Sequence, residues 1–201
     1  PSATFVNESN QRTADTIQGW AGAGYFGEGY NGVAEDDAVG RFASGTGLYL
    51  IGGTWQATAI ANGDQKIGFF AMPPGDSGLH IASGSMGMGW HISAKSEKEL
   101  AAGAFIALIT SEEWAQKLAD IGRVPVLTTG VTVDSPLFQN TIDGSGKILK
   151  DGGITYSFDW ATGTMMQTMG GALQELMDNR IQTADFLDRV QADWQAFQDA
   201  K

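Results

Sequence analysis

The chain has 201 residues, of which 12 are basic and 23 acidic, so it carries a formal net charge of -11 at neutral pH. Apolar residues make up 42% and charged residues 17%, which supplies enough apolar side chain for a buried core and excludes a disordered chain. The acidic balance also excludes general binding to the phosphate backbone of nucleic acids and favours a neutral or cationic ligand.

The first part of the sequence predicts helices separated by glycine-rich segments. Residues 8–22 have the spacing of a modest amphipathic helix. Residues 22–32 contain five glycines among aromatic residues, which indicates an irregular loop. Residues 37–44 predict a short helix that Asp36 caps at its start and Gly45 ends in the left-handed conformation.

Short apolar runs then predict strands that alternate with helices. Residues 48–51 form a continuous apolar run with glycine on both sides, the pattern of a strand buried on both faces. The Gly-Gly-Thr turn that follows leads into a predicted helix over 55–61, and further strands are predicted over 67–72 and 86–93. This alternation is typical of an α/β protein.

Predicted helices dominate the rest of the chain. Ser96 and Glu99 have the spacing of a capping box ahead of a helix that ends near residue 109. Four further helices are predicted over 112–122, 136–142, 162–177 and 183–198. Extended segments before the second and third of these helices indicate that the chain crosses between two lobes.

The sequence contains none of the common catalytic, metal-binding or nucleotide-binding motifs. Its carboxylates show no distinctive spacing for a catalytic pair, and most of them belong to predicted helix faces. His80 and His91 belong to no metal-binding pattern, and no cysteine is available to supply a thiolate. No glycine-rich turn ends in the Lys-Ser or Lys-Thr of a phosphate loop. We therefore expect no catalytic residue, no metal and no cofactor.

The placement of tryptophan is the most informative chemical feature. Trp55, Trp90 and Trp160 fall at the ends of predicted elements, whereas the other three tryptophans lie within predicted helices and are expected in the core. The apolar face of a pyranose ring stacks on an aromatic side chain, and its hydroxyls need polar partners. Trp55 with Gln56, and Trp160 with Asp159, offer this combination. The alternative for any one of these tryptophans is a half-buried residue that covers a core edge.

Several segments share their order and spacing with a known family. Residues 42–55 read Phe-Ala-Ser-Gly-Thr-Gly-Leu-Tyr-Leu-Ile-Gly-Gly-Thr-Trp, residues 67–75 read Ile-Gly-Phe-Phe-Ala-Met-Pro-Pro-Gly, and residues 89–96 read Gly-Trp-His-Ile-Ser-Ala-Lys-Ser. Gly-Arg-Val-Pro follows at 122–125 and Gln-Ala-Asp-Trp at 191–194. In this order they resemble the C-terminal half of the extracellular solute-binding proteins of carbohydrate ABC transporters, the maltose-binding-protein-like family.

The resemblance implies a set of sugar-contacting residues. The tryptophan of the Gly-x-Trp turn commonly stacks on the sugar in this family, which implies that role for Trp55, with Gly53 allowing close approach and Gln56 as a hydroxyl partner. Trp160, next to Asp159, takes the place of an aromatic residue that precedes the long penultimate helix.

Trp90 and Arg123 complete the set of candidates. Trp90 matches a strand that enters the other lobe, although a core role suits it equally well. Arg123 matches a position beside the cleft, but it could equally interact with the C-terminus of the preceding helix.

The resemblance also implies an architecture and partners. It implies an α/β, two-lobed fold of the periplasmic-binding-protein type II class, of which this chain has the C-terminal portion. Residues 1–80 and 129–201 would belong to the C-terminal lobe, and residues 81–128 to the N-terminal lobe. No reaction is implied. The implied partners are a mono- or oligosaccharide, the permease subunits of an ABC importer, and a missing N-terminal half or a second chain that completes the fold.

The implied location is extracellular or periplasmic, with a membrane tether through a lipoprotein signal that lies outside these 201 residues. The first residues themselves have neither the basic nor the apolar region of a secretion signal. Two alternatives remain from the sequence. One is a glycan-active hydrolase, which needs a pair of carboxylates in the aromatic cleft and for which Asp159 is the only acid that the sequence places there. The other is a free-standing carbohydrate-interaction domain.

Overall fold

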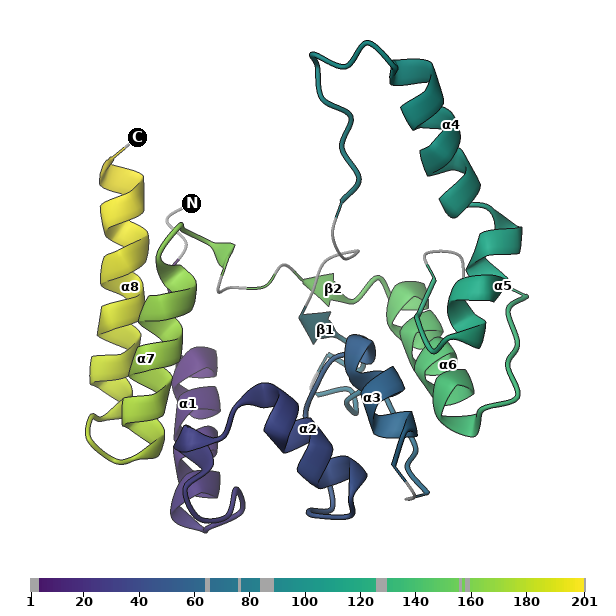
Figure 1. Cartoon of the computed structure of the whole chain (residues 1–201). Coiled ribbons are helices and arrows are strands. Elements are labelled where there is room, and N and C mark those ends of the chain that lie inside the picture. The colour runs from purple at the N-terminus through teal and green to yellow at the C-terminus, as the bar shows by residue number, and fades with distance from the viewer. Residues whose placement is uncertain are drawn as a thin grey trace. The chain divides into compact units, whose positions relative to one another are not determined.

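The computed structural model describes residues 4–63, 66–75, 77–83, 89–125, 130–155, 157 and 160–200 (Figure 1). By their internal contacts the residues form two compact units, Pro1–Val33 with Tyr156–Lys201 and Ala34–Thr155. Each unit has a hydrophobic core of its own. Among the helices of these described ranges, none is both long and apolar enough to cross a membrane.

Three helices build the first unit. They are α1 (Glu8–Gly22), α7 (Met165–Met177) and α8 (Thr183–Asp199), which lie side by side in Figure 1. Their core joins the small residues Ala14 and Ala172 to Leu176, which is completely buried. Small side chains at these positions allow the helix backbones to approach, so that the larger residues fill the space between them.

The glycine-rich segment that follows α1 is held to the end of α7. It contains one 3₁₀ turn (Tyr30–Gly32), as expected for an irregular loop. The hydroxyl of Tyr30 donates a hydrogen bond to the carbonyl of Met177 at 2.8 Å. The Asn31 amide donates to the carbonyl of Gln174 at 3.0 Å. The first bond gives a donor to the carbonyl of the last residue of α7, and the second adds to the bond that the Gln174 carbonyl accepts from the N–H of Asp178.

The second unit contains most of the elements. In chain order they are α2 (Glu35–Ala43), a 3₁₀ turn (Thr54–Gln56), α3 (Ala57–Ala61), β1 (Ala82–Ser83), α4 (Glu99–Ile109), α5 (Glu112–Asp120), α6 (Pro136–Lys150) and β2 (Ile154–Thr155). β1 and β2 pair in parallel, with Ala82 opposite Ile154 and Ser83 opposite Thr155. The core joins α5 to α6 through Ala119 and Ile142.

Five helices end in the same hydrogen-bonded turn. The residue after the cap is left-handed, its N–H bonds back to a carbonyl in the last turn, and the next N–H bonds to the carbonyl one residue further back. The left-handed residues are Gly24, Gly45, Gly122, Gly152 and Asn179. The prediction that Gly45 ends a helix is confirmed, since its N–H bonds to the carbonyl of Phe42 at 2.9 Å. Glycine is favoured because it has no side chain to oppose this conformation.

The strand predictions over 48–51 and 67–72 are wrong for this structure, because neither segment is assigned as a strand. Leu48 is 89% exposed, although the apolar run predicts burial on both faces. A strand forms only where another strand accepts its backbone hydrogen bonds, and local sequence does not specify that partner. Of the predicted strand 86–93, residues 86–88 lie outside the described part, and residues 89–93 are not a strand.

Three helix boundaries also differ from expectation. The capping box of Ser96 does not form, because α4 begins at Glu99 with Lys98 at the N-cap position. α2 begins at Glu35, so the predicted cap Asp36 lies inside the first turn. α6 continues past residue 142 to Lys150. Gly144 lies within α6 and packs closely on Phe69, since an added Cβ would lie 2.8 Å from the ring.

Candidate functional site

The Trp55 side chain lies in the turn that starts α3, against the backbone of Gly53. The indole is 64% exposed. A Cβ placed on Gly53 would lie only 2.0 Å from atom Cζ3 of the Trp55 ring. The ring therefore occupies the space that any other residue at position 53 would fill. The sequence predicts that Gly53 allows close approach of a sugar; in this structure it accommodates the indole.

Three hydrogen bonds join neighbouring side chains to this turn. Nε1 of Trp55 donates to Oε1 of Glu35 at 3.3 Å, and Nε2 of Gln56 donates to the same oxygen at 2.7 Å. Nη1 of Arg123 donates to the carbonyl oxygen of Trp55 at 3.2 Å. The structure thus brings together Gly53, Trp55, Gln56 and Arg123, four of the residues that the sequence singled out.

Arg123 reaches Trp55 because of the way α5 ends. Gly122 is left-handed, with φ of 79°, and the N–H of Arg123 bonds to the carbonyl of Leu118 at 2.9 Å. The hydroxyl of Thr58, on α3, donates to the carbonyl of Ile121 at 3.2 Å. These bonds fix the end of α5 beside α3. The Arg123 guanidinium bonds to Trp55 there, and not to the last carbonyls of α5.

Gln56 is the buried member of the group. It is 9% exposed, and within the described residues its Oε1 is a buried atom without a hydrogen-bond partner. A Cβ on Gly52 would lie 1.9 Å from this oxygen, so glycine at position 52 leaves the space that the amide uses. Glu35 therefore holds the amide through Nε2. Leaving a polar atom unsatisfied costs free energy, so this orientation depends on the bond that is made.

Glu35 is the residue of this site that the sequence does not reveal. It is the first residue of α2, where an acidic side chain is expected for its favourable interaction with the helix dipole. Its bonds to Trp55 and Gln56 span about 20 positions of chain. A match of Glu35 to a family motif would have identified it from the sequence. The family-like segments begin at residue 42, after Glu35, so no such match exists there.

The remaining candidates are Trp90, Trp160 and Asp159. Trp90 is 63% exposed and packs edge to face on Phe105 of α4, with ring centroids 5.8 Å apart. Trp160 is an exposed residue of the other unit. Asp159 lies outside the described residues, so its predicted role has no structural counterpart here.

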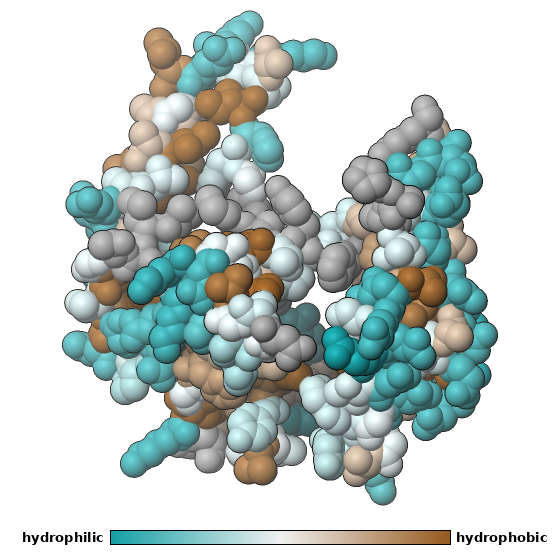
Figure 2. All heavy atoms as spheres, turned by 180° about the vertical axis from the view of Figure 1, so that it is seen from behind, coloured by the Kyte–Doolittle hydropathy of each residue, from teal (hydrophilic) through white to brown (hydrophobic). Residues whose placement is uncertain are grey.

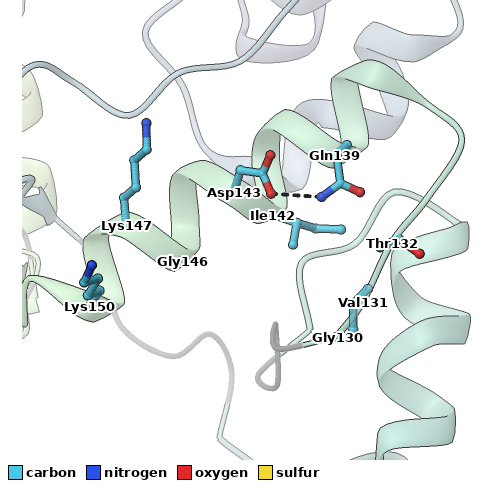
Figure 3. A pocket seen from close by; sticks show the side chains of 9 residues that line it. All are labelled: Gly130, Val131, Thr132, Gln139, Ile142, Asp143, Gly146, Lys147 and Lys150. Atoms are coloured by element: carbon cyan, nitrogen blue, oxygen red, sulfur yellow. Dashed lines mark hydrogen bonds between the residues drawn. The ribbon is translucent and has the colours of Figure 1, made fainter.

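A separate cavity of about 510 Å³ lies between α6 and residues 130–132 (Figure 3). Its lining includes Lys147 and Lys150 and none of the predicted sugar-contacting residues. Nε2 of Gln139 donates to Oδ1 of Asp143 at 2.9 Å across its wall. The lining contains no aromatic ring on which a sugar could stack. We therefore place the candidate site at Trp55 and not in this cavity.

Among the described residues, the carboxyl groups whose pKa departs from its ordinary value are all shifted downward. The Lys117 ammonium lowers the pKa of Glu113. The backbone N–H and the ring of His80 lower the pKa of Asp151. For Asp193, burial raises the pKa, but hydrogen bonds from three threonine hydroxyls outweigh it and the net shift is downward. A glycosidase acid needs the opposite shift, because it must hold a proton near neutral pH.

Comparison with known proteins adds independent evidence. Residues 3–143 match the family model described as bacterial extracellular solute-binding protein. The curated multiple sugar-binding protein of Streptococcus mutans serotype c is 34% identical over 112 residues. That alignment covers 54% of this chain and 27% of the relative, so the match spans about a quarter of the relative's length.

Proposed function

Because the chain belongs to the bacterial extracellular solute-binding protein family, we propose that it is part of a sugar-binding protein that serves a membrane ABC importer. The family implies a fold of the periplasmic-binding-protein class and a location outside the cytoplasm. The family's description and the relative's name both denote binding and not catalysis. The proposed ligand is a neutral mono- or oligosaccharide, in keeping with a net charge of -11.

The observation that carries this proposal is that the indole of Trp55 is both exposed and held in place. Its indole is exposed, yet it is held by Glu35 at Nε1, by Gly53 against one part of the ring, and by Arg123 at its carbonyl. An aromatic face that is already fixed loses little conformational entropy when a ligand stacks on it. A fixed, solvent-facing indole therefore suits the apolar face of a sugar ring.

The other predicted contacts belong to the same proposal. Arg123 provides a polar group beside the indole for the hydroxyls of the sugar. The Gln56 amide is buried and bonded to Glu35, so in this arrangement it supports the turn. Trp160 with Asp159, and Trp90, would contact other parts of the ligand. Closure of two lobes on the ligand would then bring these contacts together, because the closed state gains contacts that the open state lacks.

The exposed apolar residues support the proposal that further protein completes the fold. Leu48 and Leu100 are 89% and 93% exposed, and Tyr49 and Ile51 are also exposed. Brown apolar atoms lie at the surface over α4 in Figure 2. Large apolar side chains left exposed in this way are typical of an interface with another protein surface. We propose that the remainder of a two-lobed protein, or a second chain, covers it.

We propose the lobe boundaries implied by the resemblance, with residues 1–80 and 129–201 in the C-terminal lobe and residues 81–128 in the N-terminal lobe. We also propose that the permease subunits of the importer contact the assembled protein, and that a lipoprotein signal tethers it to the membrane.

Calorimetric titration with glucose, galactose, maltose and sucrose tests the function. We expect at least one of these sugars to bind, and we expect Trp55→Ala to weaken that binding about tenfold or more, a loss of roughly 1.4 kcal/mol or greater. Trp20→Ala is the matched control, because Trp20 lies on α1 in the other unit. Equal affinity for the Trp55→Ala variant would contradict the site, and hydrolysis of a glycoside by the wild type would contradict the function.

A further inference from the structure

The structure assigns a positioning role to Glu35: its carboxylate holds the indole of Trp55 and the amide of Gln56 in the arrangement that the sugar site uses. This inference rests on the proposed function. Glu35 lies about 20 residues before Trp55, on a different helix, and a single oxygen of its side chain accepts both hydrogen bonds. Trp55 and Gln56 are adjacent in sequence, so the carboxylate of Glu35 fixes both side chains of the turn.

The two bonds act on different parts of the site. The bond at 3.3 Å restrains rotation of the Trp55 ring, which is 64% exposed and lies against the backbone of Gly53. The bond at 2.7 Å restrains Gln56, whose side chain is buried. Both restraints need an acceptor oxygen at this position, and the charge of the carboxylate strengthens each bond further.

The orientation of Gln56 makes Glu35 hard to replace. With Oε1 of Gln56 unpartnered among the described residues, the bond from Nε2 to Glu35 is the hydrogen bond that selects this amide orientation. Loss of the carboxylate would leave both ends of a buried amide unpaired. The amide would then reorient, and the indole beside it would lose the acceptor for its own N–H.

An interaction with the helix dipole does not account for this arrangement. Asp36 and Asp37 share the first turn of α2 with Glu35 and have the same favourable interaction with the N-terminus. No hydrogen bond to the Trp55 turn is found for either of them within the described residues, whereas Glu35 makes two. Asp36→Ala therefore removes a charge from the same helix end without touching the site, and it serves as the control.

The test combines a measurement without ligand and one with sugar. In the 201-residue chain labelled with ¹⁵N, the indole N–H signal of Trp55 is assigned by its loss in Trp55→Phe. We expect Glu35→Ala to move this signal upfield and to increase the fast motion of the indole, and we expect Glu35→Gln, which keeps an acceptor oxygen, to restore most of both. Asp36→Ala should leave the signal in place.

The same variants are then titrated with glucose, galactose, maltose and sucrose. We expect Glu35→Ala to lower the affinity for the sugar that binds by about 3- to 10-fold, because ordering a mobile indole on binding has an added entropic cost. We expect Glu35→Gln to recover most of the affinity and Asp36→Ala to match the wild type.

The two measurements separate the inference from the proposed function. An unchanged Trp55 signal in Glu35→Ala would overturn the positioning role, whatever the sugar result. Binding that depends on Trp55 but is equal in Glu35→Ala would also overturn it, while leaving the proposed function intact. A shifted Trp55 signal in a protein that binds none of the sugars would overturn the function, and the structural part of the inference would stand.

Discussion

Glycine residues shape the Trp55 site as much as the aromatic ring does. Gly53 leaves space for the indole and Gly52 leaves space for the Gln56 amide. Gly122 directs the chain from α5 to Arg123, and a Cβ at that position would lie 2.4 Å from the ring of Phe138. At each of these three positions a larger residue would collide with a specific neighbouring side chain, so replacing the glycine would disturb the site.

Gly122 and Gly130 offer a matched pair for testing this explanation. Both have φ of 79°, but nothing lies within 4 Å of a Cβ added to Gly130. We expect Gly130→Ala to cost about 1 kcal/mol of unfolding free energy, the penalty of a left-handed alanine. Gly122→Ala should cost about 1 to 3 kcal/mol more, because the methyl group also displaces Phe138. Chemical denaturation of the two variants measures the difference. Equal losses would show that Phe138 does not restrict position 122.

The sequence could identify Trp55, Gln56 and Arg123 as candidates, but not how they are held together. Trp55 and Gln56 follow a glycine turn in a family-like segment, and Arg123 follows a predicted helix end. The sequence could not identify Glu35 as a site residue, because its role consists of contacts with residues about 20 positions away. An acidic residue in a first helical turn has a sufficient local explanation, so sequence alone gives no reason to look further.

At the scale of elements, a carboxylate on α8 holds the segment that leads into α7. Asp193 accepts hydrogen bonds from the hydroxyls of Thr162 at 2.5 Å, Thr164 at 2.8 Å and Thr168 at 2.5 Å. Trp160 lies two residues before the first of these threonines. The cluster therefore fixes the start of α7 and the chain next to a predicted sugar-contacting residue.

We expect Asp193→Ala to lower the free energy of unfolding by about 1 to 3 kcal/mol, because three hydroxyls lose a charged acceptor. The exposed Asp188, also on α8, supplies the control Asp188→Ala. Because the net effect of the three hydroxyls is to lower the pKa of Asp193, the stabilisation is present above the ordinary aspartate pKa near 4 and is lost as pH falls through the lower folded-state pKa. Thermal or urea unfolding from pH 7 to pH 2 measures this. A wild-type advantage that persists unchanged at pH 2 would contradict it.

Helices and strands were not equally predictable. The start and end of α1 at residues 8 and 22 agree with the sequence, as does the start of α8 at Thr183, because helix limits depend on local caps and glycines. Residues 48–51 have a clear strand pattern but no strand partner among the residues that the structure describes. An apolar run of this kind predicts a strand that is buried between neighbouring strands. It forms that strand only where those neighbours are present.

At the scale of the whole molecule, apolar surface on the second unit predicts association. Leu48, Tyr49, Ile51 and Leu100 are exposed there, and Tyr49 packs edge to face on the exposed ring of Phe70. We expect the 201-residue chain to bind the dye ANS and to self-associate in sedimentation velocity, and we expect added salt to favour association by screening the net charge of -11. A compact monomer that binds no ANS would contradict the proposed interface.

Contact between a sugar and the face of Trp55 is the central claim, and intermolecular nuclear Overhauser effects measure it most directly. With a sugar of the panel bound, we expect cross-peaks between the C–H protons of the sugar ring and the indole ring protons of Trp55, assigned through Trp55→Phe. Cross-peaks that reach only other residues, such as those lining the cavity beside α6, would contradict the claim and place the sugar elsewhere.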